Sequence, residues 1–204
     1  RMRDVAEVYR RYRIKLMNNN ALDFDDIILL TVRILKENED IAEKYQARFQ
    51  YILVDEYQDT NNSQYELIHI LAGGYGNICV VGDDDQSIYK FRGANINNIL
   101  GFERDYRDAK RIMLEQNYRS TSTILNAANA VIAHNKKRMG KKLWTASGDG
   151  EKITVYTGYT EKDEARFIAS EIAKEYKRTG TYSGCAVLYR INAQSRAIEE
   201  TFMR

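Results

Sequence analysis

Two adjacent carboxylates, Asp55 and Glu56, end an apolar run in the segment YILVDEYQDT, residues 51–60. The run at 52–54 is continuous, as is typical of a strand buried on both faces of a parallel sheet. The carboxyl end of such a strand borders the crevice where α/β proteins bind ligands. One carboxylate there can hold Mg²⁺ while its neighbour accepts a proton from water, which is the pairing that nucleotide hydrolysis needs. The alternative is a solvated acidic strand end, because so short a string also arises by chance.

A second candidate segment, GDDDQSIYKFRGA at 82–94, also follows an apolar run. Its Gln86 can hydrogen-bond a γ-phosphate, or the water that attacks it, without adding charge. Its Tyr89, Phe91 and Arg92 combine exposed rings with a cation, as surfaces that stack single-stranded nucleic acid do, at roughly 1–3 kcal/mol per base. The alternative is that both rings belong to the core, which their i, i+2 spacing in a loop disfavours.

A third segment, LEQNYRST at 114–121, contains Arg119. A fixed guanidinium can act as an arginine finger that reaches a transferring phosphoryl group across a domain interface, worth about 10³–10⁵ in rate. The alternative is a surface arginine near a helix start, where the helix dipole disfavours a cation.

Other polar and sulfur-containing residues predict structure rather than chemistry. The acidic run 83–85 does not have the spacing of an EF-hand loop, so we expect a solvated turn. The basic, glycine-containing stretch KKRMGKK at 136–142 predicts a loop. Cys79 and Cys185 lie far apart in apolar runs, which predicts two buried, reduced thiols of a cytoplasmic protein.

The elements that position these residues follow from hydrophobic periodicity and capping signals. Apolar runs separated by helical patterns predict a parallel sheet of the βα type. After Arg119 a helix begins near Ser122, and a fresh βαβ pattern then follows. Predicted strands are 50–54, 78–81, 112–114, 153–156 and 186–189, and predicted helices include 4–17, 24–36 and one from a capping box at Thr160 and Asp163 to Gly180.

Composition sets broad limits on the chain. Its 204 residues are 44% hydrophobic and 29% charged, as expected for a folded globular protein, and the net charge of +2 favours neither acidic nor basic partners. No apolar run approaches the roughly 18 residues that predict a membrane span. The first residues lack the apolar core of a signal peptide.

The three candidate segments, in this order, resemble motifs II, III and IV of the superfamily 1 DNA helicases of the UvrD, PcrA and Rep type. ALDFDDIILLT at 21–31 resembles the helix before motif II, and VLYRINAQSRAIEE at 187–200 resembles part of the second motor domain. The resemblance covers nearly the whole chain and is closest to the PcrA branch. It implies an α/β fold: a RecA-like P-loop NTPase sheet with flanking helices, incomplete in the first motor domain, plus the first part of a second RecA-like domain.

The resemblance implies a role for each matching residue. Asp55 would be the Walker B magnesium ligand, and Glu56 the base that activates water. Gln86 would sense the γ-phosphate that Arg119 contacts. Tyr118 would stack near the adenine. Tyr89, Phe91 and Arg92 would couple the nucleotide site to a single-stranded DNA groove, with Phe91 as the base-stacking ring. Arg190 and Asn192 would contact the DNA backbone.

The sequence also departs from the family pattern. It has no G-x-x-x-x-G-K-[ST], so the Walker A loop is missing, as are the adenine-recognising glutamine motif and motifs V and VI. We therefore expect an internal fragment. Residues 1–20 would end an inserted helical subdomain, 21–115 would be the C-terminal part of the first RecA-like domain, and 116–204 the first part of the second.

The implied parent is an ATP-dependent 3′ to 5′ DNA helicase or translocase serving repair or replication. Its cofactors would be ATP and Mg²⁺, and its substrates would be single-stranded DNA and single-strand/duplex junctions. Its candidate partners would be repair or replication-initiator proteins, and we expect no membrane partner. Two alternatives stay open. In the first, the isolated chain would be a catalytically inactive DNA-binding or interaction module. In the second, the parent would be the helicase part of a nuclease–helicase recombination-repair subunit.

Overall fold

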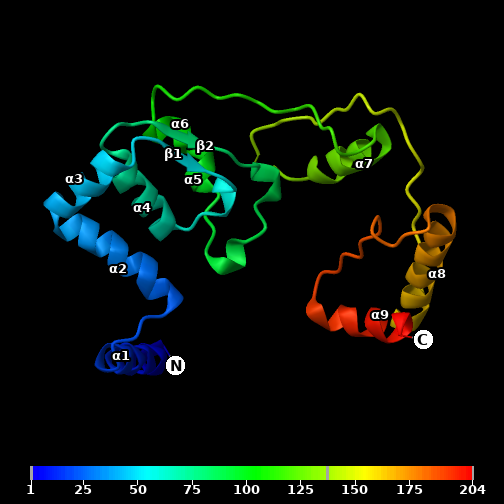
Figure 1. Cartoon of the computed structure of the whole chain (residues 1–204), viewed down its shortest axis with the longest axis horizontal. Coiled ribbons are helices and arrows are strands. Elements are labelled where there is room, and N and C mark those ends of the chain that lie inside the picture. The colour runs from blue at the N-terminus through cyan, green and yellow to red at the C-terminus, as the bar shows by residue number, and fades with distance from the viewer. Residues whose placement is uncertain (1, 137, 204) are drawn as a thin grey trace. The chain divides into compact units, whose positions relative to one another are not determined.

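The computed structural model describes residues 2–136 and 138–203, and the chain divides into two compact units between Gly148 and Asp149 (Figure 1). The first unit contains α1 (Met2–Asn18), α2 (Phe24–Glu37), α3 (Glu39–Arg48), β1 (Ile52–Val54), η1 (Tyr57–Asp59), α4 (Asn62–Ala72), β2 (Ile78–Val80), η2 (Asp84–Gln86), η3 (Lys90–Arg92), α5 (Asn97–Leu100), α6 (Phe102–Asp105) and α7 (Ser122–Ile132). The second contains α8 (Glu161–Thr179), η4 (Asn192–Gln194) and α9 (Ser195–Phe202).

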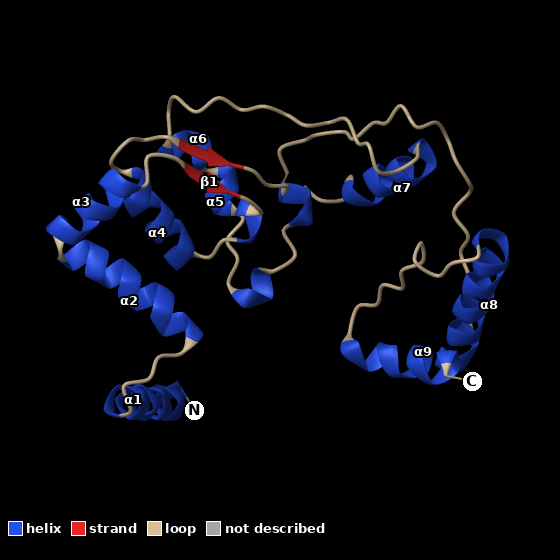
Figure 2. Cartoon of the chain, in the orientation of Figure 1, coloured by secondary structure: helices blue, strands red, loops and turns tan. Residues whose placement is uncertain are grey.

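The two strands of the first unit form a parallel pair, drawn side by side in Figure 2. Ile52 pairs with Ile78, and Val54 pairs with Val80. Helix α4 contacts β1 and also packs against α2 and α3. The predicted α/β class with a parallel sheet is therefore confirmed, in a small sheet. Because both strands run the same way, the loops after them, which carry the candidate residues, leave from the same edge.

Capping side chains set the starts of several helices. Asp23 caps α2 by accepting the amide of Asp26 at 2.8 Å, and Asn61 caps α4 by accepting the amide of Gln64 at 2.9 Å. In both cases the side chain of the third helical residue accepts a hydrogen bond from the backbone N–H of the cap residue, completing a capping box. The core of this unit includes Val32, Leu35, Ala42, Tyr57, Ala72, Ile99 and Leu125.

The second unit is a helical pair in which α8 contacts α9. The predicted capping box is confirmed, because Thr160 and Asp163 exchange hydrogen bonds at the start of α8. The predicted end of this helix is also confirmed: Gly180 takes φ +73°, a left-handed conformation that glycine adopts without steric cost. Ala165 is buried, and the rings of Tyr156 and Phe167 stack with centroids 4.1 Å apart.

Three predicted strands are wrong. The segments 112–114, 153–156 and 186–189 form no ladder and are loops in Figure 2. A strand is stabilised by its neighbours, and these apolar runs have no pairing partner among the described residues. Sequence reasoning also missed α3. Lys137, in the predicted basic loop, and Arg204 lie outside the described residues.

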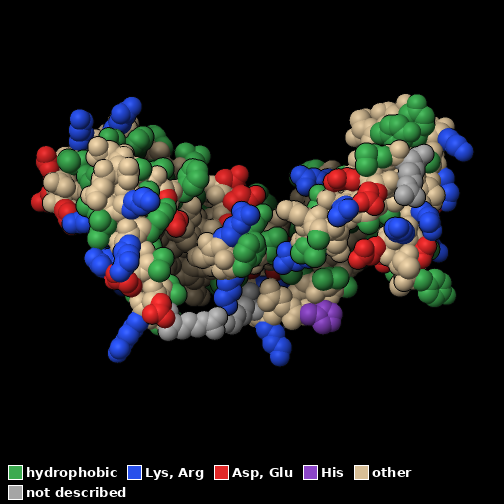
Figure 3. All heavy atoms as spheres, turned by 90° about the horizontal axis from the view of Figure 1, so that it is seen from below, with side chains coloured by type: hydrophobic (Ala, Val, Ile, Leu, Met, Phe, Trp, Pro, Cys, Tyr) green, Lys and Arg blue, Asp and Glu red, His purple; other side chains and the backbone are tan. Residues whose placement is uncertain are grey.

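The expectation that the apolar strands are buried on both faces is also wrong. Leu53 and its register partner Cys79 share one face of the sheet, and both are exposed, whereas the flanking strand residues are half-buried. The prediction of two buried thiols fails with it, since Cys185 is only half-buried, although both cysteines are free. Figure 3 likewise shows hydrophobic side chains on the face in view. Among the described residues, no helix is both long and apolar enough to cross a bilayer.

Candidate functional site

The turn after β1 holds Asp55 and Glu56 in an unusual backbone conformation. Glu56 has φ +50° and ψ +40°, the left-handed region, and its amide donates to Oδ1 of Asp55 at 2.9 Å. A non-glycine residue in this region costs on the order of 1–2 kcal/mol. The conformation begins the 3₁₀ turn η1 and leaves both carboxylates exposed at the carboxyl edge of the sheet.

Gln58, which sequence reasoning missed, fixes the carboxylate of Glu56. Its side chain is only 1% exposed, and its Nε2 donates to Oε2 of Glu56 at 2.7 Å. Its Oε1 accepts the amide of Asp83, in the loop after β2, at 2.9 Å. One buried amide therefore ties the ends of the two strands together. The only signal for this residue in the sequence was the presence of a glutamine two positions after Glu56.

Gly82 allows this close approach. A Cβ on Gly82 would lie 2.6 Å from Oε1 of Gln58 and 2.8 Å from Cδ1 of Ile99, both inside normal contact distance. The glycine that ends the second apolar run is thus required by the packing of Gln58 beside it.

Gln86 is exposed and points its amide at a neighbouring carboxylate. Its Nε2 donates to Oδ2 of Asp83 at 2.7 Å. Burial raises the pKa of the Asp83 carboxyl, but hydrogen bonds from Lys141 and Gln86 outweigh it and hold that pKa below its usual value. A continuous hydrogen-bonded path therefore runs from Glu56 through Gln58 and Asp83 to Gln86.

The acidic run is not the solvated turn that the sequence predicted. Asp84 is buried and accepts the amide of Met139 at 2.6 Å. Asp83 pairs with Lys141, and Asp85 pairs with Arg138. The cations come from the predicted basic loop more than 50 residues away, so the charges of the two loops neutralise each other and permit burial.

The residues at the end of β1 fit a magnesium site in which the protein contributes few ligands. Among the described residues, Oδ2 of Asp55 has no hydrogen-bond partner, and Oδ1 of Asp59 is buried without one. Burial, and then the charge of Glu56, raises the pKa of the Asp59 carboxyl. No group of three or more ligating side chains occurs in the described parts of the chain. The exposed carboxylate of Asp55 is an oxygen ligand that could hold Mg²⁺ together with waters and substrate phosphates, as magnesium sites commonly do.

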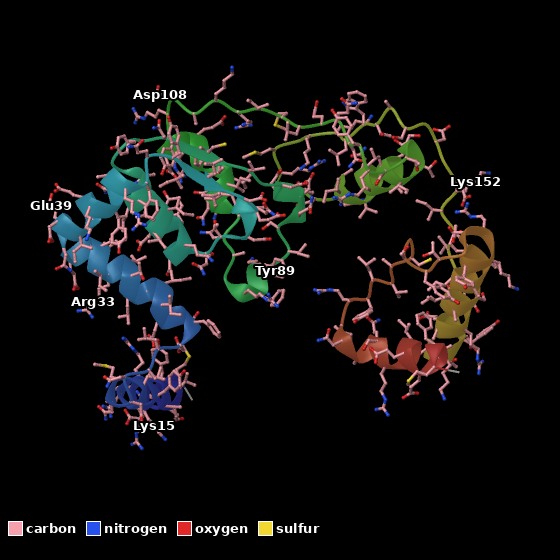
Figure 4. The ribbon with its side chains drawn as sticks, viewed as in Figure 1. Lys15, Arg33, Glu39, Tyr89, Asp108 and Lys152 are labelled. Carbon is pink, nitrogen blue, oxygen red and sulfur yellow. The ribbon has the colours of Figure 1, made fainter. Side chains whose placement is uncertain are left out.

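Tyr89, Phe91 and Arg92 form an exposed cluster around η3. The guanidinium of Arg92 lies 5.0 Å from the ring centroid of Tyr89 and 5.6 Å from that of Phe91. Phe91 is 71% exposed, so its expected position outside the core is confirmed. Figure 4 shows Tyr89 on the turn that projects away from α3 and α6. Exposed rings held beside a cation present the stacking faces that single-stranded nucleic acid uses.

Tyr118 and Arg119 lie in an exposed turn before α7. Oδ1 of Asn117 accepts the amides of Arg119 and Ser120, at 2.9 and 2.7 Å, and so shapes the turn. Tyr118 is 81% exposed and donates to Oε1 of Gln116 at 3.0 Å. In the described residues, no hydrogen bond or ion pair joins the guanidinium of Arg119 to the site around Glu56.

Arg190 and Asn192 belong to the second unit. Both are exposed, and Oε1 of Gln194 accepts the amides of Arg190 and Ile191, which fixes the backbone before α9. Their side chains are available for contact, and their expected role in binding the DNA backbone stays a prediction.

Comparison with known protein families identifies the family of this chain. Residues 1–107 match the UvrD/REP helicase N-terminal domain, and residues 112–204 match the UvrD-like helicase C-terminal domain. The chain belongs to the UvrD/REP helicase family. The sequence-based identification of the family is thereby confirmed.

Similar proteins within the UvrD/REP family include two called ATP-dependent DNA helicase PcrA. They come from Staphylococcus epidermidis strain RP62A and Staphylococcus aureus strain NCTC 8325, and each is 56% identical to this chain over 200 residues. The match covers 98% of this chain and 27% of each relative, so the chain spans about a quarter of the length of the curated relatives it matches.

In this UvrD/REP chain, the structure brings together one or two candidate residues from each of motifs II and III. Asp55, Glu56 and Gln86 share the hydrogen-bonded carboxyl edge of the sheet, through Gln58 and Asp83. The roles of all the candidate residues, and the domain boundary expected between residues 115 and 116, stay predictions.

Proposed function

We propose that this chain is the part of an ATP-dependent 3′ to 5′ DNA helicase that activates water for ATP hydrolysis and reports the nucleotide state to single-stranded DNA. The hydrogen-bonded path from Glu56 through Gln58 and Asp83 to Gln86 supports the proposal. It joins the carboxylate of Glu56, whose backbone is left-handed, to the exposed amide of Gln86, which precedes the aromatic cluster in the same loop.

The proposed chemistry assigns the proton of the attacking water to Glu56. Gln58 occupies Oε2 of this carboxylate, so Oε1 is the oxygen left to accept the proton. Gln86 would orient toward the γ-phosphate, and Arg119 would stabilise the charge on the transferred group, reaching it on closure of two RecA-like domains. Mg²⁺ at Asp55 would neutralise phosphate charge, and Tyr118 would stack near the adenine.

The proposed substrate is single-stranded DNA and its junctions with duplex, in repair or replication. Tyr89, Phe91 and Arg92 would stack bases, while Arg190 and Asn192 would contact the backbone. Protein partners would be repair or replication-initiator proteins.

The test is Glu56→Gln in the full-length protein. We expect ATP affinity to stay within about twofold while DNA-stimulated hydrolysis falls by about 10²–10⁴, the usual loss when a general base is removed. Glu43→Gln, an exposed change on α3, is the matched control. Near-normal turnover in Glu56→Gln would show that Glu56 is not the base.

For the isolated chain we propose a DNA-binding module without hydrolysis, because the sequence has no Walker A loop while the aromatic cluster is already exposed. An ATPase assay and a single-stranded DNA titration of the chain test this. Hydrolysis by the isolated chain would overturn it.

A further inference from the structure

The segment 138–145, which follows α7 and belongs to no helix or strand, contacts both motif III and the Arg119 turn. None of the implied roles involves it. At its first end, Nε and Nη2 of Arg138 donate to the two carboxylate oxygens of Asp85, at 2.9 and 2.7 Å. The two side chains are only 17% and 11% exposed, so this bidentate pair is largely shielded from water.

Three further contacts secure the same end. Nη2 of Arg138 also donates to the carbonyl of Lys141 at 2.7 Å, which folds the segment on itself. Lys141 pairs with Asp83, the residue that accepts the amide of Gln86, and the amide of Met139 donates to buried Asp84. The position of Gln86 is therefore tied to the segment through Asp83.

The other end of the segment pairs with the turn that carries Arg119. The amide of Trp144 donates to the carbonyl of Glu115 at 3.0 Å, and the amide of Asn117 donates to the carbonyl of Trp144 at 2.8 Å. These two bonds form an isolated parallel bridge between Gln116 and Trp144. Asn129 of α7 anchors the segment from the side by donating to the carbonyl of Leu143 at 2.9 Å.

We propose that the 138–145 segment is a positioning element that sets Gln86 and Arg119 relative to each other. Asn117, which the segment holds, also accepts the amides of Arg119 and Ser120. From Lys141 to Trp144 an extended chain spans about 10 Å, at about 3.3 Å per residue. A connection this short, fixed by ion pairs at one end and backbone pairing at the other, transmits a displacement of motif III to the arginine turn.

The inference rests on the proposed function for its consequence in catalysis but not for its structural part. If Gln86 and Arg119 act on the same phosphoryl group, loosening the segment changes turnover rather than nucleotide affinity. Arg138→Gln and Asp85→Asn each break the shielded bidentate pair at this end, and they leave the Lys141–Asp83 pair, Gln86, Arg119 and the segment's other end in place. Lys142→Gln is the control, since it removes one charge from an exposed residue of the same segment.

The first measurement is hydrogen exchange, followed by mass spectrometry, in the full-length protein. Cutting the ionic end should make the amides of residues 115–120 and 144 exchange about tenfold faster, while Lys142→Gln leaves them unchanged. Unchanged exchange at 115–120 in both cutting variants would overturn the proposal, whether or not the protein hydrolyses ATP.

The second measurement is steady-state ATP hydrolysis with saturating single-stranded DNA. We expect kcat to fall 10- to 100-fold in Arg138→Gln with KM for ATP within about twofold, since a misplacement of about 1 Å can cost on the order of 10²-fold. The double variant Asp85→Asn/Arg138→Gln should lose no more than either single one, because both cut the same link. Faster exchange with wild-type kcat would restrict the segment to a structural role and overturn the positioning claim.

The variants could show the expected change in exchange while the wild-type protein has no ATPase activity. That result would refute the proposed function and leave the structural connection standing. If Arg138→Gln fails to fold, Arg138→Lys keeps the charge but loses the bidentate fork, and it should show the same exchange pattern more weakly. Exchange in Arg138→Lys identical to wild type would then count against the proposal.

Discussion

The buried amide of Gln58 holds Oε2 of Glu56 at 2.7 Å, although Glu56 sits in a left-handed backbone conformation. The same amide accepts the backbone N–H of Asp83, so the conformation of the proposed base depends on the neighbouring strand end. A carboxylate held by a residue that is itself fully packed is pre-organised, which spares the reaction the cost of orienting it.

Replacement of Gln58 by alanine should therefore harm both stability and turnover. Loss of the amide leaves the N–H of Asp83 without its acceptor, which costs about 1–3 kcal/mol of unfolding free energy. We also expect kcat for ATP hydrolysis to fall at least about tenfold, since Glu56 loses its orienting contact. Urea denaturation and steady-state kinetics measure the two effects. Gln50→Ala removes an exposed glutamine just before β1 and should change neither. A stable, fully active Gln58→Ala protein would contradict this account.

Gly82→Ala tests the same contact from the other side. The added methyl would lie 2.6 Å from Oε1 of Gln58, so that side chain or the strand end has to shift. Overpacking of this kind costs typically about 1–3 kcal/mol, and we expect turnover to fall together with stability. Gly184→Ala is the matched control, because its Cβ would meet open space at a φ that alanine tolerates. Equal urea midpoints for the two variants would mean that the strand end shifts to accommodate the methyl group without loss of stability.

The sequence was informative wherever local chemistry decides structure. Capping residues such as Thr160 and Asp163 satisfy backbone groups within three positions, so their pattern is readable without knowledge of the fold. The carboxylates after β1 were predictable for a similar reason, since an apolar run that ends in charge marks a strand tip. The exposure of Leu53 and Cys79 was not predictable, because it depends on which elements pack against the two faces of the sheet.

Contacts between distant segments account for what the sequence did not reveal. The acidic run 83–85 and the basic loop at 136–142 were each predictable as exposed loops, and only tertiary packing makes them partners. Their opposite charges were the one available signal. Gln58 gave a weaker signal still, because a single glutamine has no periodicity or motif that predicts burial.

Phe91→Ala should weaken binding of single-stranded DNA in the full-length protein. The ring is 71% exposed and lies against the guanidinium of Arg92, so its removal should cost about 1–3 kcal/mol of stacking, or roughly a 5- to 150-fold rise in Kd. Fluorescence anisotropy at a fixed salt concentration measures the change, because salt alone alters such affinities strongly. Tyr75→Ala removes an exposed ring that precedes β2 and should leave Kd unchanged. An equal Kd for Phe91→Ala and wild type would exclude a stacking role.

Acid should weaken the tie between motif III and the 138–145 segment through Asp83. The pKa of this carboxyl lies below its usual value in the folded protein, so the ionised form stabilises the fold. That contribution is fully present above the unfolded pKa of about 3.9 and is lost as the pH falls through the lower folded value. Asp83→Asn should therefore be less stable than wild type at pH 7, with a difference that shrinks below about pH 4. Urea midpoints of both proteins from pH 7 to pH 3 give the curve, with the exposed Asp108→Asn as control. A constant difference across that range would show that Asp83 stabilises the fold by packing and not by its charge.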